Sequence, residues 1–200
     1  KQILESRLAD TVKWSVIEQK AGSDAEYTLT GSYWTEPGRM KLIAKLRKQV
    51  PAIALRTTCL VGFPGETPKA FRNLMDFVRE TGFDHLGAFA YSREPGTAAA
   101  RLPGQVDEKT KSERLEQLMS LQKKCSRKAG ESRVGKVLEV LVEKVGSEGA
   151  EGRSQFQAPE VDGKVLVSGP TARMKRLKPG SFCKAKATAA RDYDLVAELI

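Results

Sequence analysis

The feature that most constrains the fold is a glycine-rich stretch at residues 60–67, Leu-Val-Gly-Phe-Pro-Gly-Glu-Thr, which follows an apolar run. Gly62 and Gly65 permit positive φ and close backbone approach, and Pro64 fixes one φ between them. The threonine and proline at positions 67 and 68 are typical of an N-cap and a first helical position. The stretch therefore predicts a strand, a tight turn and a helix.

The neighbouring segments extend this pattern in both directions. Residues 39–50 are periodic and stop at Pro51, and residues 53–61 and 83–91 are short and apolar. Between those two runs, the spacing of apolar residues from Phe71 to Val78 predicts a helix that Gly82 ends. The order helix, strand, helix, strand favours an α/β fold with parallel strands and helical crossovers.

In such folds, ligands bind at the carboxyl ends of the strands, so residues 62–66 are where a small molecule is expected. The glycine spacing alone equally fits a plain turn between a strand and a helix, because it is not the GxGxxG pattern of dinucleotide-binding proteins.

Composition bounds the class of protein. The chain has 200 residues, of which 40% are hydrophobic and 30% charged, so it can bury a core. No apolar run approaches the roughly 20 residues that cross a bilayer, and the first residues lack a signal peptide's apolar core. We therefore expect a cytoplasmic protein without a membrane partner. The net charge of +9 fits a polyanionic partner but does not by itself specify one.

The cysteines and the single histidine do not predict a metal site. Cys59, Cys125 and Cys183 lie far apart, with no CxxC or cysteine–histidine pair. Each is expected to be a small buried hydrophobe. His85 has no nearby carboxylate or cysteine motif and is expected to be a satisfied strand residue.

A change of pattern near Gly130 predicts a second module. Asp107 can cap a long charged helix, and this helix precedes the second module. After residue 130 the strand candidates are residues 134–145, 153–157, 164–168 and 182–188. About 70 residues with roughly five short strands suit a small closed barrel of the OB-like kind, because closure removes exposed edges.

One side of this barrel is expected to be basic. Residues 171–186 contain six cations and no acid, and nucleic acid is the usual partner of such a surface. Against that, residues 131–200 hold 12 Lys and Arg and 10 Asp and Glu, a net charge of only +2.

Several motifs together resemble one enzyme family. Residues 56–58 (Arg-Thr-Thr), 61–67 and 91–94 with 96–97 look like the second half of the radical SAM domain of the methylthiotransferases. The basic barrel ending in Tyr-Asp-Leu-Val-Ala-Glu at 193–198 is similar to the TRAM domain of these enzymes. Residues 92–94 and 158–163 (Ala-Pro-Glu-Val-Asp-Gly) resemble the RimO-type branch, which methylthiolates an aspartate of a small-subunit ribosomal protein.

The resemblance covers residues 39–200 and implies a domain order. Residues 39–130 would be the second half of a radical SAM partial (β/α) barrel, and residues 131–200 the TRAM barrel. Residues 1–38 do not resemble the family and are an atypical leader.

The resemblance also implies the cofactors. Family members carry a 4Fe-4S cluster on a CxxxCxxC loop that reduces S-adenosylmethionine, and a second cluster that supplies sulfur. This sequence has no CxxxCxxC. We therefore expect a carboxyl-terminal fragment that does not catalyse the reaction alone, and we assign no catalytic or metal-binding residue.

The resemblance implies two sets of site residues. Arg56 would pair with the carboxylate of S-adenosylmethionine, and Glu66 could line the pocket or serve as an acid in the first turn of the helix. The expected cofactor-binding residues are Arg56, Thr57, Gly62, Phe63, Pro64, Gly65, Glu66, Tyr91 and Ser92. The expected substrate-docking residues are Glu160, Asp162, Arg173, Lys175, Arg176, Lys178, Lys184 and Lys186.

The partner expected for the barrel is a basic ribosomal protein, which the acids at 160 and 162 would complement. Contacts with RNA or the ribosome are a further expectation. The alternatives are a tRNA methylthiotransferase of the MiaB-like branch and a non-catalytic RNA-binding TRAM module.

Overall fold

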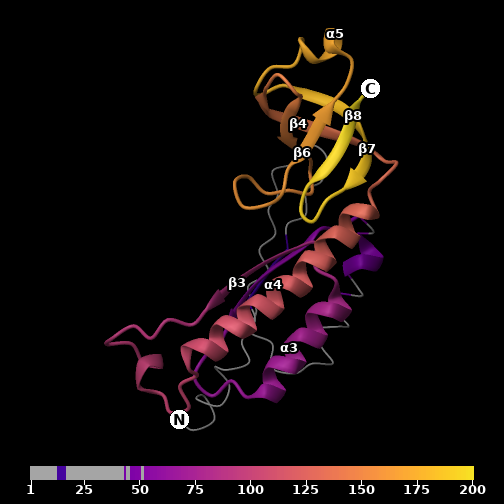
Figure 1. Cartoon of the computed structure of the whole chain (residues 1–200). Helices are drawn as coiled ribbons and strands as arrows, with labels where there is room; N and C mark the ends of the chain where they lie inside the picture. The colour runs from indigo at the N-terminus through magenta and orange to yellow at the C-terminus, as the bar shows by residue number, and fades with distance from the viewer. Residues whose placement is uncertain (1–12, 17–42, 44–45, 51) are drawn as a thin grey trace. The chain divides into compact units, whose positions relative to one another are not determined.

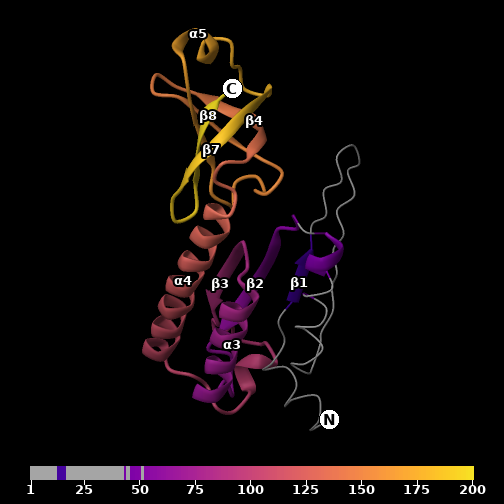
Figure 2. The same cartoon turned by 90° about the vertical axis from the view of Figure 1, so that its right-hand side faces the viewer.

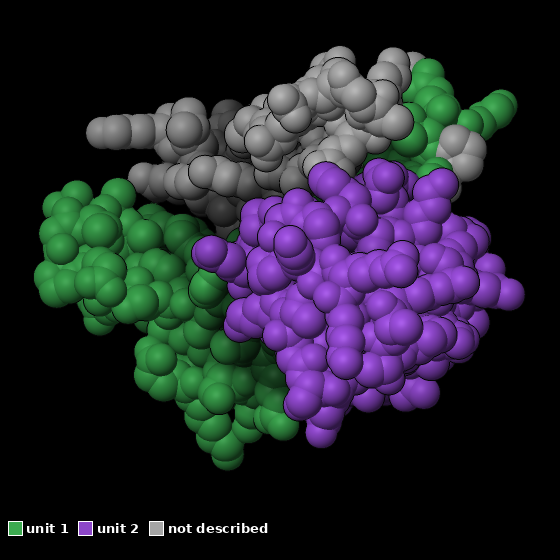
Figure 3. All heavy atoms as spheres, turned by 90° about the horizontal axis from the view of Figure 1, so that it is seen from above, with its two compact units in different colours: residues 1–122 green, residues 123–200 purple. Residues whose placement is uncertain are grey.

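The computed structural model describes residues 13–16, 43, 46–50 and 52–200. The chain forms two compact units, Lys1–Gln122 and Lys123–Ile200, which Figure 3 colours separately. Most of the predicted leader, residues 1–38, lies outside the described residues. Of the helix predicted at 39–50, residues 46–49 are helical and Ile43 is buried.

The first unit contains a three-stranded sheet in the order β1-β2-β3 (Figure 2). β2 (Leu55–Val61) and β3 (His85–Ala90) are parallel, which confirms the predicted crossover. β1 (Lys13–Val16) pairs with β2 antiparallel and was not predicted, because no structure was assigned to the leader, residues 1–38.

The crossover helix α3 (Pro68–Thr81) has the predicted ends. The Thr67 side chain accepts a hydrogen bond from the Ala70 N–H at 3.1 Å, and Gly82 closes the helix with φ +58°. This is the N-cap and left-handed C-cap arrangement that threonine and glycine favour. Phe71 and Val78 are buried on the inner face of the helix.

One face of the sheet is packed and the other is open. Along β2, Leu55, Cys59 and Val61 are buried with the apolar residues of α3 and with Leu118 of α4 (Glu108–Glu131). On the opposite face, Leu60 and Phe89 are cross-strand neighbours and are 49% and 61% exposed. This pattern follows from the two-residue period of a strand.

Asp107 caps α4 as predicted, because its side chain accepts a hydrogen bond from the Thr110 N–H at 2.9 Å.

The second unit contains a closed five-stranded barrel in the order β4-β5-β6-β8-β7 (Figure 1). The barrel interior is apolar: β4, β6 and β8 contribute valines and leucines, and the four buried alanines are 150, 185, 187 and 197. The strands are β4 (Val137–Val145), β5 (Ala150–Arg153), β6 (Val165–Ser168), β7 (Phe182–Ala190) and β8 (Leu195–Leu199), with a short helix α5 (Thr171–Met174) between β6 and β7. The predicted closed barrel is confirmed.

Two details of the barrel differ from the prediction. The strand expected at 153–157 ends at Arg153, because the Gln157 side chain accepts from both the backbone and the hydroxyl of Ser154, at 2.9 and 2.7 Å, and makes a turn. β8 was not predicted, although its buried positions 195, 197 and 199 alternate.

The domain boundary predicted after residue 130 stays a prediction, and α4 continues to Glu131. None of the helices in the described part of the chain is long and apolar enough to span a membrane.

Candidate functional site

The glycine turn lies where the carboxyl ends of the two parallel strands meet. Gly62 and Gly65 have φ of +73° and +86°, as their positions predicted. The Glu66 N–H donates to the Phe63 carbonyl at 2.9 Å and closes the turn. The Tyr91 N–H donates to the Val61 carbonyl at 2.9 Å, so Tyr91 continues the ladder beside the turn.

Glu66 holds this turn in place from within the protein. Its Oε2 accepts from the Gly62 N–H at 2.7 Å and from Arg114 Nη1 of α4 at 2.5 Å. Arg114 also donates to the Glu66 carbonyl at 3.1 Å, and the two side chains are 7% and 9% exposed. The proposed alternative role for Glu66 as an acid in the first turn of α3 is wrong, because the helix begins at Pro68, after the cap.

A second cation of α4, Lys111, packs against the turn. A Cβ on Gly62 would lie 2.4 Å from Lys111 Cγ, so only glycine leaves room for this side chain. Lys111 Nζ lies 5.2 Å from the ring centroid of Tyr91, and the Tyr91 and Phe63 rings pack edge to face at a centroid distance of 5.3 Å. This arrangement places aromatic rings and a buried ammonium beside the glycine backbone.

Sequence reasoning missed Lys111 and Arg114, which it treated as part of a charged helix surface. Their i, i+3 spacing places them on one face of a helix. That spacing was the signal available, but it does not distinguish a buried face from an exposed one.

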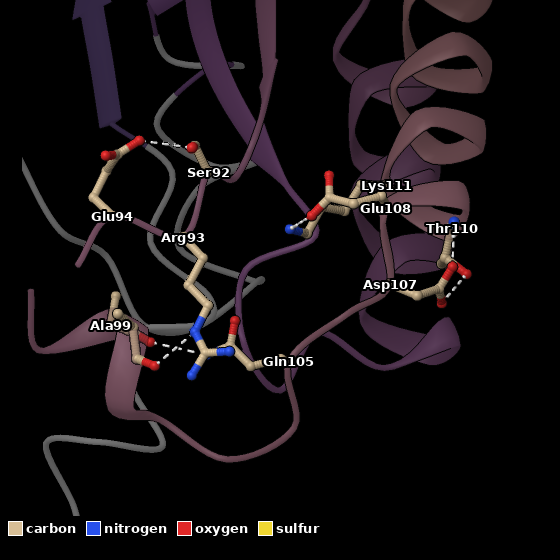
Figure 4. Close-up of polar contacts among 10 residues, drawn as sticks. Ser92, Arg93, Glu94, Ala99, Gln105, Asp107, Glu108, Thr110 and Lys111 are labelled. Carbon is tan, nitrogen blue, oxygen red and sulfur yellow. Dashed lines mark hydrogen bonds and ion pairs between the residues drawn. The ribbon is translucent and has the colours of Figure 1, made fainter.

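The loop after β3 is held by its own polar contacts (Figure 4). Ser92 Oγ donates to Glu94 Oε1 at 2.7 Å, and Arg93 Nε donates to the Ala100 carbonyl at 3.0 Å. Ser92 is exposed whereas Tyr91 is buried, so these adjacent residues do not share one environment. Gln105 Nε2 ties the loop further to the Ala99 carbonyl at 3.0 Å.

The expected cofactor-binding residues fall into two groups. Gly62, Phe63, Pro64, Gly65, Glu66, Tyr91 and Ser92 lie at the carboxyl ends of β2 and β3. Arg56 and Thr57 lie near the start of β2, and the six residue steps from Arg56 to Gly62 correspond to about 20 Å of strand. Thr57 is buried with the core, whereas Arg56 lies on the other face, where burial lowers its pKa from the usual range.

The cysteines do not form a ligand set for a cluster. Burial raises the pKa of Cys59 to about 12 and raises that of Cys183, which disfavours the thiolates that bind iron. Cys59 and Cys183 belong to different units. Across the described ranges, no group of three or more His, Cys, Asp or Glu side chains could hold a metal ion.

The acidic docking residues lie in the loop between β5 and β6. Asp162 Oδ2 accepts from the Ala158 N–H at 2.7 Å and closes this loop. Glu160 is exposed and has φ +67°, the only positive value of a non-glycine residue in the described part of the chain. Sequence reasoning treated the two acids as an equivalent pair, but Asp162 shapes the loop that presents Glu160.

The cationic docking residues lie at the opposite end of β6. They follow this strand in α5, in the turn after it and on β7: Arg173, Lys175, Arg176, Lys178, Lys184 and Lys186. Lys186 and Glu198 are cross-strand neighbours, and Glu198 is level with Ser168, the last residue of β6. The structure therefore separates the acidic loop from the cations by the length of β6.

Comparison with known proteins agrees with these features. A model of the TRAM domain matches residues 134–200. The protein named ribosomal protein uS12 methylthiotransferase RimO from Chloroherpeton thalassium is 44% identical over 160 residues, which are 80% of this chain and 37% of that protein. The equally named protein from Pelotomaculum thermopropionicum is 46% identical over 163 residues, 80% of this chain and 36% of that protein.

The chain therefore spans little more than a third of the length of these relatives. It is similar to RimO-type methylthiotransferases over four-fifths of its own length, as the sequence motifs indicated. Among solved structures, the apo form of Mycoplasma genitalium RNase R was matched with a TM-score of 0.25 and 14% sequence identity. The match covers 46% of this chain and 18% of the RNase R chain. That likeness is too low to indicate fold or function.

Proposed function

We propose that this chain supplies part of the cofactor pocket and the docking barrel of a RimO-type methylthiotransferase, which adds a methylthio group to the β-carbon of an aspartate in a small-subunit ribosomal protein. The observation that carries the proposal is the similarity to proteins of that name, which extends over 80% of the chain at 44–46% identity. The relatives' printed names supply the ribosomal protein as substrate. The aspartate rests on the RimO-like motifs alone.

The first unit would contribute the second half of a radical SAM partial barrel, at residues 39–130. The parallel pair β2–β3 and the glycine turn at its carboxyl end support this assignment. When bound, S-adenosylmethionine supplies the radical chemistry. Gly62 and Gly65 would let it approach the backbone, and Phe63 would offer an apolar contact. The expected cytoplasmic location stays a prediction.

This chain by itself should not assemble the cluster, because its sequence lacks CxxxCxxC and its cysteines do not converge. After reconstitution with iron and sulfide, we expect no cluster absorbance and no 5′-deoxyadenosine from S-adenosylmethionine. Release of 5′-deoxyadenosine by the purified chain would contradict this part of the proposal.

The TRAM barrel, residues 131–200, would dock the protein substrate. A ribosomal protein is basic, so Glu160 would pair with it, while the cations beyond β6 would contact a different part of the same partner or the ribosomal RNA beside it. Asp162 would act indirectly by holding the loop.

A pull-down tests the partner. Wild type, Glu160→Lys and the double variant Arg173→Glu/Lys175→Glu are compared for binding to the small-subunit protein and to tRNA. We expect Glu160→Lys to lose the ribosomal protein, and Glu148→Lys, an exposed acid in the β4–β5 turn, to retain it. Equal binding by wild type and Glu160→Lys would contradict this docking mode.

RNA binding is the second candidate, favoured by the TRAM match and by the outer face of β7. Phe182 is 65% exposed there, and Lys184 and Lys186 follow at two-residue spacing. Exposed aromatic rings and cations together bind single strands by stacking and counterion release. In that case tRNA binding would weaken with salt by a log–log slope of roughly −0.7 per phosphate. It would also be lost in the Arg173→Glu/Lys175→Glu variant and in Phe182→Ser.

A further inference from the structure

A buried ammonium group beside the glycine turn has no role in the site described so far. The Lys111 side chain is 2% exposed, and its Nζ donates to Glu108 Oε1 at 2.7 Å. A lysine ammonium has three N–H donors, and Glu108 is the one hydrogen-bonding partner that the described residues provide. Buried charges are normally paired and fully hydrogen-bonded, so this group has donor capacity to spare.

Tyr91 adds a second donor at the same place. Its hydroxyl is buried and has no hydrogen-bond partner within the described part of the chain, and the residue is 8% exposed. Buried tyrosine hydroxyls usually have a partner. The Lys111 ammonium lies over the ring of this same tyrosine, at 5.2 Å from its centroid. Lys111, which packs against Gly62, and the neighbouring Tyr91 hydroxyl therefore both lack a full set of acceptors among the described residues.

Glu108 shows that a carboxylate can reach the ammonium from solvent. It lies in the first turn of α4 and its side chain is 86% exposed, yet its carboxylate contacts Lys111 (Figure 4). Holding a solvent-exposed partner contributes little stability, since an exposed side chain loses entropy when it is fixed. A carboxylate on a ligand can take the place of Glu108 at low cost.

We propose that Lys111 and Tyr91 form the subsite for the carboxylate of an amino-acid ligand at the glycine turn. The inference rests on the proposed function, under which that carboxylate belongs to the methionine part of S-adenosylmethionine. One carboxylate oxygen accepts from Lys111 and the other from the Tyr91 hydroxyl. Lys111 contacts Gly62 itself, whereas Arg56, the cation expected from the motifs, lies about 20 Å away along β2. Glu108 occupies the subsite in the absence of ligand.

The test is isothermal titration of the full chain with two ligands. S-adenosylmethionine carries the carboxylate, whereas 5′-methylthioadenosine shares the nucleoside and lacks it. Lys111→Met should weaken S-adenosylmethionine binding about tenfold, the usual cost of a hydrogen bond to a charged group. It should leave 5′-methylthioadenosine unchanged. Glu108→Gln removes the competing carboxylate and should strengthen S-adenosylmethionine binding alone.

Two further variants keep the test decisive. Lys109→Met changes an exposed lysine two positions away on α4 and should bind both ligands like wild type. Tyr91→Phe keeps the ring and removes only the hydroxyl, so it should lose S-adenosylmethionine affinity even where Lys111→Met does not fold. Circular dichroism of each variant establishes that it is folded.

The outcomes separate the subsite from the proposed function. If wild type binds both ligands but none of the three subsite variants changes the ratio of their affinities, the carboxylate subsite is overturned and the pocket stands. If wild type binds neither ligand, the pocket and the subsite fail together. A change in that ratio in the expected directions supports the assignment of Lys111 and Tyr91.

Discussion

Arg114 Nη1 and Glu66 Oε2 lie 2.5 Å apart and join α4 to the glycine turn across 48 positions of sequence. The same carboxylate oxygen accepts from the Gly62 N–H, so one buried ion pair fixes both ends of the turn. Removing one partner of a buried pair leaves a charge without compensation.

We therefore expect Arg114→Leu to lower the free energy of unfolding by about 3–5 kcal/mol. Urea unfolding measures this as a lower midpoint with an unchanged slope. Arg79→Leu is the control, because its partner Asp76 is exposed and such pairs contribute about 0–1 kcal/mol. Similar losses of unfolding free energy in the two variants would show that the Arg114–Glu66 pair does not stabilise the glycine turn.

The two glycines of the turn should respond differently to alanine. Both have positive φ, which costs an alanine roughly 1–2 kcal/mol. At Gly62 the new Cβ would also lie 2.4 Å from Lys111 Cγ, whereas at Gly65 nothing lies within 4 Å. Gly62→Ala should therefore destabilise the chain by about 1–3 kcal/mol more than Gly65→Ala. Thermal unfolding of the two variants measures the difference. Equal losses of stability would argue against the close contact of Gly62 with Lys111.

Glu160 offers a test of stability against binding. Its φ of +67° is unfavourable for a residue with a Cβ, so Glu160→Gly should raise the free energy of unfolding by about 1 kcal/mol. If the side chain docks the ribosomal protein, the same variant should bind that partner less tightly. If Glu160→Gly is more stable and binds the ribosomal protein as tightly as wild type, Glu160 is not part of the docking surface.

Cys59 should be unreactive in the native protein. Burial raises its pKa to about 12, so its thiolate fraction at pH 8 is lower by about a thousandfold than that of an ordinary thiol. Because the shift disfavours the charged form, reactivity should increase only as the pH approaches that value or when the chain unfolds. Alkylation with iodoacetamide, followed by mass spectrometry of native and urea-unfolded chain, measures the difference. Equal labelling in both states would contradict the burial of this thiol.

Local sequence determined the elements whose ends depend on backbone chemistry. Thr67 and Gly82 bound α3 because a hydroxyl can satisfy a free N–H and glycine can adopt positive φ, and both effects act within a few residues. The short apolar runs after residue 130 likewise predicted a small closed barrel, though not its last strand β8, since closure removes the exposed edges of a small sheet.

Only the tertiary structure decided which charged side chains are buried and which charged residues become neighbours. Lys111 and Arg114 are ordinary members of a charged helix in the sequence, and only the packing of α4 on the turn makes them part of the site. The acid-free segment at residues 171–186 gains acidic neighbours in the sheet, Glu139 beside Lys184 and Glu198 beside Lys186. These relationships depend on contacts between residues far apart in the chain, which the local pattern does not encode.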